Sequence, residues 1–205
     1  LGGNVPGFIR TFVPVTVSAT INGTPTTATY YVTPDYLAIG HDDDFVRIPM
    51  TPLIAQPIAD ALGCLLPTRK MVNDIHSQAT VKLSPQPISP AYVDIMLVAT
   101  QYRHNDIILG QQQGYALGPL VGGIKKDVVI TAQIPTHPGK VAIYGWHYLN
   151  GTPIQPLYLG HEISYVDYSH GIRLVKNWML VKGQEMSVAA VLADPLLCVL
   201  LSDEG

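Results

Sequence analysis

The chain has 205 residues, of which 47% are hydrophobic and 13% are charged, and its formal net charge is −3. We expect residues 1–205 to form a single domain, with residues 51–110 as an alternative helical subdomain. Basic residues cluster only as short pairs, so we expect no nucleic-acid partner. No apolar stretch reaches 18 residues, so we expect no membrane span.

Two strand pairs are predicted at the start of the chain. Residues 9–32 contain two runs rich in β-branched and aromatic residues, separated by Asn22-Gly23, which is typical of a tight hairpin turn. Residues 35–49 contain two short apolar runs around the acidic triplet 42–44. The triplet predicts a solvated turn, because the spacing of a calcium-binding loop is absent.

Helices are predicted next. Thr51-Pro52 and Thr68 have the residue types of helix starts, and the apolar residues that follow each recur at helical spacing. Pro57 is expected to kink or restart the first helix. Residues 94–109 predict a third helix, and the glycine-rich residues 111–123 predict an ordered surface loop.

The last third predicts more strands, at 126–133, 140–148, 154–158 and 165–175, with Asn150-Gly151 as a second turn. The expected fold is therefore α+β. It has a mixed or mostly antiparallel sheet with hairpins at about 9–32 and 140–175. A helical hairpin at about 51–79 packs against that sheet.

The two cysteines, Cys64 and Cys198, both lie among leucines. They are expected to be buried thiols. A disulfide in an exported chain is an alternative, and so is a nucleophilic role for Cys64, although an apolar setting makes a thiol inert.

Polar, protonatable residues concentrate between 139 and 175. His147, His161 and His170 fall within 24 residues, and histidine exchanges protons near neutral pH. Strand alternation places Tyr168 on the face of His170, and Asp167 on the opposite face. These three histidines and Tyr168 are the candidate catalytic residues.

Neighbouring residues are candidates for substrate binding. Trp146 and Tyr148 could stack on sugar rings, and Arg173 and Lys126 could bind anionic groups. Asp167 is a further candidate for substrate binding. The three histidines could instead hold zinc, although their spacing matches no short zinc signature. We therefore expect no cofactor, with zinc at His147, His161 and His170 as the alternative.

The stretch SHGIR at 169–173 resembles the SHGC-x-R signature of the L,D-transpeptidases, and His147 in IYGWH could match the upstream histidine of that family. The family's nucleophilic cysteine is replaced by Ile172, so the resemblance does not carry the transpeptidase activity. More widely, segments such as GKVAIYGWH, PIQPLY and VDYSHGIRLV resemble an uncharacterised family of secreted bacterial proteins. That resemblance implies a secreted or periplasmic location.

These observations favour a hydrolase or lyase that acts on a cell-wall polymer such as peptidoglycan, or on another extracellular polymer, through histidine and tyrosine acid–base chemistry. The partner would be a polymeric or carbohydrate ligand. One alternative is a non-catalytic carbohydrate-binding module. The other is a structural domain whose histidines are buried and hydrogen-bonded.

Overall fold

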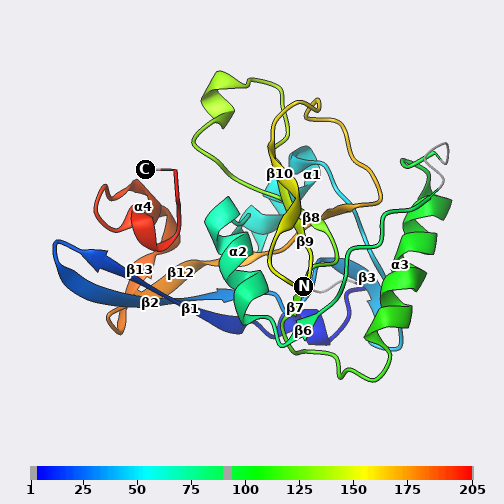
Figure 1. Cartoon of the computed structure of the whole chain (residues 1–205), viewed down its shortest axis with the longest axis horizontal. Coiled ribbons are helices and arrows are strands. Elements are labelled where there is room, and N and C mark those ends of the chain that lie inside the picture. Colours follow the sequence, from blue (N-terminus) through cyan, green and yellow to red (C-terminus); the bar gives the residue numbers. More distant parts are fainter. Residues whose placement is uncertain (1–3, 90–93, 205) are drawn as a thin grey trace.

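Antiparallel hairpins, joined by helices and long connections, organise the chain (Figure 1). A computed structural model describes residues 4–89 and 94–204. Its open sheets are mostly antiparallel and are combined with four helices in the described residues, so the predicted α+β class is confirmed.

The first sheet is built on the predicted N-terminal hairpin. Asn22 and Gly23 both have positive φ angles, 49° and 75°, which is the backbone of the predicted turn. The strands run in the order β1-β2-β12-β13, and the short strand β5 pairs with β12. Their bounds are β1 Val13–Ile21, β2 Thr24–Val32, β5 Cys64–Leu65, β12 Val175–Val181 and β13 Gln184–Ser187.

The second sheet holds four of the candidate site residues, namely Lys126, Trp146, His147 and His170. Its order is β10-β9-β8-β11, and β11 pairs with β8 in parallel whereas the other pairs are antiparallel. The bounds are β8 Lys126–Val128, β9 Ile143–His147, β10 Pro153–Tyr158 and β11 His170–Gly171. All five residues of β9 are buried. β9 is therefore covered on both faces.

Smaller elements complete the fold. The predicted second strand pair forms as β3, Ala38–His41, and β4, Asp44–Arg47. A parallel pair joins β6, Val81–Lys82, to β7, Val121–Gly122. Three short 3-10 turns occupy Phe8–Arg10, Ile134–Thr136 and Cys198–Leu200.

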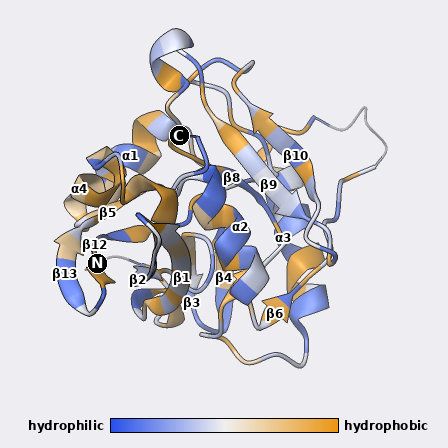
Figure 2. Ribbon diagram, turned by 60° about the vertical axis from the view of Figure 1, so that its left-hand side comes forward, coloured by the Kyte–Doolittle hydropathy of each residue, from blue (hydrophilic) through white to orange (hydrophobic). Residues whose placement is uncertain are grey.

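The helices are α1 Pro52–Ala61, α2 Arg69–Gln78, α3 Val98–Gln112 and α4 Val188–Ala193. Thr68 caps α2, because its Oγ1 accepts a hydrogen bond from the backbone N–H of Met71 at 3.1 Å. Pro57 lies inside a continuous α1 and does not end it. In Figure 2, α2 carries both hydrophobic and hydrophilic stretches. It contacts β1 and β9, which belong to the two large sheets, so its hydrophobic residues can pack against them.

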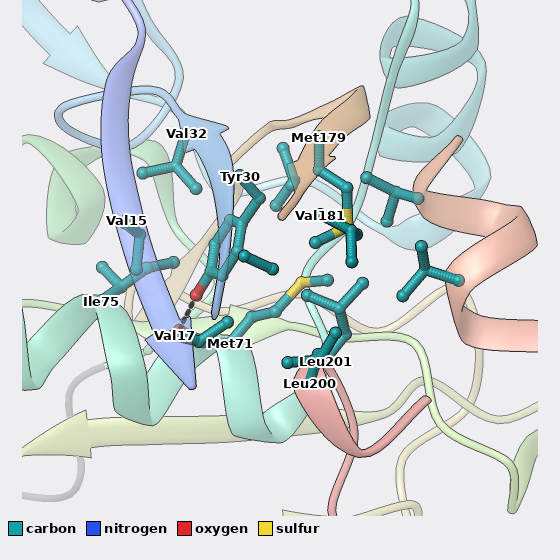
Figure 3. Close-up of a cluster of buried hydrophobic side chains, with 14 of the residues drawn as sticks. Val15, Val17, Tyr30, Val32, Met71, Ile75, Met179, Val181, Leu200 and Leu201 are labelled. Atoms are coloured by element: carbon teal, nitrogen blue, oxygen red, sulfur yellow. Dashed lines mark hydrogen bonds between the residues drawn. The ribbon is translucent and has the colours of Figure 1, made fainter. Parts of the chain in front are cut away.

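The largest hydrophobic cluster lies between the first sheet and α2 (Figure 3). Tyr30 is fully buried in it, and its hydroxyl donates to the carbonyl of Met71 at 3.4 Å, which satisfies the polar end of the ring. Met179 of β12 and Leu200 close the cluster, so the C-terminal segment packs against the N-terminal hairpin.

Several predictions need correction. The strand predicted at 126–133 ends at Val128. The loop predicted from residue 111 begins after Gln112, because α3 starts and ends later than the helix predicted at 94–109. Residues 165–169 are not in a strand, so alternation does not govern them. Cys64 and Cys198 are both free, so the disulfide alternative is wrong; Cys64 is buried as expected, but Cys198 is only half-buried. Within residues 4–89 and 94–204, no helix has the length and apolar character of a membrane span.

Candidate functional site

A tight turn, and not a strand, brings Asp167 next to His170. The Oδ1 atom of Asp167 accepts hydrogen bonds from the backbone N–H of Ser169 at 2.7 Å and from its hydroxyl at 2.5 Å. Short polar side chains stabilise turns in this way. The other carboxylate oxygen, Oδ2, then lies 4.0 Å from Nε2 of His170. The prediction that these two side chains face opposite ways is therefore wrong.

His170 is fully buried, and neither of its ring nitrogens has a hydrogen-bond partner among the described residues. Burial lowers the pKa of His170 to about 4, against the opposing influence of Asp167. The imidazole is therefore neutral near neutral pH, with one nitrogen able to accept a proton. Leaving a buried polar atom unpaired costs about 1–3 kcal/mol, so this arrangement is unfavourable for folding alone.

The carboxylate beside His170 is held in its charged form. Burial would raise the pKa of Asp167, but the attraction of His170 in its protonated form, the hydrogen bonds from Ser169 and the charge of Lys126 outweigh burial and lower it. Where His170 is neutral, Ser169 and Lys126 stabilise the carboxylate. Tyr165 donates its hydroxyl to Oδ2 of Asp167 at 2.8 Å. Burial and this contact raise the pKa of Tyr165 well above its usual value, so the phenol keeps its proton.

A series of rings connects His170 to the surface. Tyr165 meets His170 edge-on, with centroids 5.7 Å apart, and stacks on His161 at 3.9 Å. His161 in turn contacts the ring of Tyr158 at 5.0 Å, and Tyr158 is 43% exposed. We call His170, Asp167, Tyr165, His161 and Tyr158 the His170 centre.

A second buried group adjoins the backbone of this turn. Nζ of Lys125 lies 3.1 Å from Nδ1 of His104 and donates to the carbonyl of Tyr168 at 2.5 Å. The rings of His104, Tyr168 and Trp146 make edge contacts with centroids 4.8–6.3 Å apart. We call Lys125, His104, Tyr168 and Trp146 the Lys125 cluster.

Burial sets the protonation of the Lys125 cluster. It lowers the pKa of Lys125 to about 7, assisted by the charge of Arg47. It lowers the pKa of His104 to about 3, assisted by Lys125. His104 is therefore neutral and can accept the hydrogen bond from Lys125.

Buried polar atoms without partners concentrate in these two groups. Six such side-chain atoms occur among the described residues. Four belong here, namely both ring nitrogens of His170, Nε2 of His104 and Nε1 of Trp146. Native proteins pair nearly all buried polar groups, so a local concentration of exceptions points to a functional role.

The backbone of β9 turns the side chain of His147 towards α2 and not towards His170. Gly145 and Trp146 have positive φ angles, 108° and 57°, and this interrupts the alternation of the strand. As a result Tyr144 and His147, three residues apart, both hydrogen-bond to Oδ1 of Asn73 on α2, each at 2.9 Å. His147 also stacks on His76 at 4.7 Å.

The structure thus places the predicted residues in different surroundings. His161, His170 and Asp167 meet around Tyr165. Tyr168 and Trp146 lie in the Lys125 cluster, and Nζ of half-buried Lys126 lies 5.5 Å from the ring of Trp146. His147 belongs to the contacts of α2, and Tyr148 is 49% exposed at the end of β9. Trp146 is buried, so it does not offer an open stacking surface.

Arg173, predicted to bind anionic groups, is also buried. Its guanidinium donates to the carbonyls of Thr33 at 2.7 Å and Val121 at 2.8 Å, and it lies over the ring of Tyr36 at 4.4 Å. These contacts join three distant segments of the chain, so Arg173 holds the fold together around the second sheet.

Sequence reasoning missed His104, Lys125, Tyr165 and His76. His104 lies in the predicted third helix, in a polar stretch between Arg103 and Asp106, so its burial had no local indication in the sequence. Tyr165 was within the polar stretch and could have been found from its two-residue separation from Asp167. In residues 4–89 and 94–204, no group of three or more His, Cys, Asp or Glu side chains is arranged to hold a metal ion.

Comparisons of the chain with models of known protein families, with curated proteins and with solved structures found no match.

Proposed function

We propose that the chain is a secreted or periplasmic hydrolase or lyase that acts on a cell-wall or other extracellular polymer, with His170 as its proton-transferring group. The observation that carries the proposal is the unpaired, neutral imidazole of His170 beside the charged carboxylate of Asp167. A general base needs an unprotonated atom that is free to take a proton, and buried, neutral His170 has one.

Asp167 suits the role of a positioning carboxylate. It remains charged and lies 4.0 Å from the imidazole, so it would stabilise the imidazolium that forms when His170 takes a proton. Tyr165 and Ser169 hold Asp167 through their hydrogen bonds. This carboxylate would therefore favour proton transfer to the ring without taking the proton itself.

The surface end of the ring series suits a carbohydrate ligand. Tyr158 is 43% exposed where the series meets solvent, and aromatic rings are surfaces on which sugars stack. Lys126, which lowers the pKa of His170, supplies a positive charge nearby for an acidic group or a developing oxyanion.

The test is turnover by His170→Gln. The purified chain would be incubated with peptidoglycan sacculi and with soluble acidic and neutral polysaccharides, while released reducing ends and amino groups are measured. We expect His170→Gln to lose about 10²–10⁴-fold in rate. His41→Gln, which changes an exposed histidine on β3, should retain the wild-type rate.

Thermal unfolding of both variants shows whether each one is folded at the temperature of the assay. If His170→Gln melts early, His161→Gln at the half-buried end of the series provides the same test. Undiminished turnover in a folded His170→Gln, or no product from any polymer with the wild-type chain, would overturn the proposal.

A non-catalytic carbohydrate-binding module is the second candidate, favoured by the exposure of Tyr148 and Tyr158 at 49% and 43%. It predicts that the wild-type chain retains a polysaccharide without cleaving it. Tyr158→Ala should then weaken retention, while His170→Gln should leave it unchanged.

A further inference from the structure

A separate open pocket lies between α2 and the turn that joins β9 to β10. Its volume is about 440 Å³, within the range of roughly 300–1,000 Å³ for small-molecule sites. The lining comes from Asn73, His76 and Ser77 of α2, from Lys82 of β6, from Tyr144 of β9 and from the turn at 149–153. We call it the α2 pocket.

Two hydrogen-bond acceptors of the α2 pocket are already occupied by the protein. Oδ1 of Asn73 accepts from the hydroxyl of Tyr144 and from Nε2 of His147, both at 2.9 Å. Oδ1 of Asn150 accepts from the backbone N–H of Thr152 at 3.0 Å. Each of these amides is therefore left with its NH₂ group, which can only donate.

The charge of the α2 pocket also favours a ligand that accepts hydrogen bonds. Lys82 is the one charged side chain among the described lining residues, and its ammonium donates to the carbonyl of Ser77 at 3.0 Å. An ammonium has three donors, so others remain for a ligand. Asp74, the neighbouring acid on α2, is paired with Lys70 at 2.8 Å and does not line the pocket.

An unpaired buried atom marks the pocket as incomplete. His76 is 4% exposed, lines the pocket, and has no hydrogen-bond partner for Nε2 within the described part of the chain. Its ring is fixed by stacking on His147 and by close packing against Gly122, where an added Cβ would lie 3.2 Å from the ring. A ligand in the pocket that reached this nitrogen would gain a hydrogen bond that the protein itself leaves unmade.

We propose that the α2 pocket binds a small ligand that carries a carboxylate, such as a sugar acid. The carboxylate bonds to Lys82 and to the NH₂ groups of Asn73 and Asn150, and His76 bonds to a further polar group of the ligand. Free amide donors and a single ammonium, without a lining carboxylate among the described residues, select an anionic ligand. The proposal does not depend on turnover at His170.

The experiment is a calorimetric titration of the full chain with D-glucuronate, with D-glucose as the uncharged analogue and glucose 1-phosphate as the phosphate analogue. We expect glucuronate to bind about tenfold or more tightly than glucose. Lys82→Met should weaken glucuronate binding by a similar factor. Lys182→Met, which removes an exposed lysine from the turn between β12 and β13, should leave binding unchanged.

A second readout follows the amides themselves. In ¹⁵N-labelled protein, the side-chain NH₂ resonances of Asn73 and Asn150 should shift on addition of glucuronate, and this should hold in His170→Gln. Tighter binding of glucose 1-phosphate than of glucuronate would overturn the choice of a carboxylate. Equal binding of glucose and glucuronate, or no binding of either, would overturn the site.

Discussion

Nζ of Lys125 lies 3.1 Å from Nδ1 of His104, and both side chains are buried, at 1% and 0% exposure. A lysine and a histidine in this position cannot both be charged without strong repulsion. Burial lowers both pKa values, to about 7 for Lys125 and about 3 for His104, and so removes the conflict at neutral pH. The pKa of Lys125 nevertheless lies within the pH range in which proteins are usually studied.

Replacing Lys125 should change how stability depends on pH. The pKa of Lys125 is about 7 in the folded chain and ordinarily 10.5, so between these values the unfolded chain binds a proton that the folded chain does not. Wild-type stability should therefore gain a contribution as the pH rises from 7 towards 10. Lys125→Met should lack it. Urea unfolding at pH 7, 8 and 9 measures the difference, and parallel curves for the two proteins would contradict the prediction.

His147 should make the fold sensitive to acid. Burial, then the neighbouring His76, lowers the pKa of His147 to about 4 from 6.5. Between pH 6.5 and 4 the unfolded chain binds this proton and the folded chain does not, so stability is lost as the pH falls through that window. His147→Gln should lose less stability than the wild type between pH 6.5 and 4.5. His41→Gln, exposed in the native chain, should follow the wild type in the same urea titrations.

The buried ion pair between Arg47 and Asp35 should be costly to break. The two side chains are 1% exposed and joined at 2.7 Å, and Arg47 also bonds to Asn105 and Gln112. Asp35→Ala leaves the guanidinium buried without its counter-charge, which should cost about 3–5 kcal/mol in the free energy of unfolding. The exposed pair of Arg69 and Asp203 provides the control: Asp203→Ala should cost less than about 1 kcal/mol. Similar losses of unfolding free energy in Asp35→Ala and Asp203→Ala would contradict this prediction.

Gly171 should tolerate no side chain. A Cβ there would lie 2.5 Å from the ring of Tyr36 and 2.7 Å from the side chain of Lys125. Gly171→Ala should therefore destabilise the chain by about 3 kcal/mol or more. Gly110 lies in α3 with no atom within 4 Å of an added Cβ, so Gly110→Ala should be neutral or stabilise by up to about 1 kcal/mol. Thermal melting of the two variants compares them directly.

The parts of the fold that were predicted correctly depend on neighbours in the sequence. Asn22-Gly23 adopts positive φ angles whatever lies around it, and Thr68 caps α2 through an atom three residues away. The stretch before His170 was predicted wrongly because Asp167 has a stronger local alternative, its bonds to Ser169, than pairing in a strand.

The candidate site was predicted only where its residues are close in the chain. His161, Asp167 and His170 lie within ten positions and do meet around Tyr165. Lys125 and His104 are 21 positions apart, and their contact depends on how α3 packs beside the second sheet. His147 was assigned to the wrong surroundings, because the positive φ of Trp146 is unusual for a tryptophan and nothing in the sequence indicates it.

The buried setting of Trp146 gives the protein an optical probe of its own interior. The chain has two tryptophans, and Trp178, the other one, is half-buried on β12 and packs against Tyr31. Trp178→Phe would leave a single indole whose emission comes from between His104, Tyr168 and Lys126. Fluorescence of that variant would report directly on events around the Lys125 cluster, with no label attached.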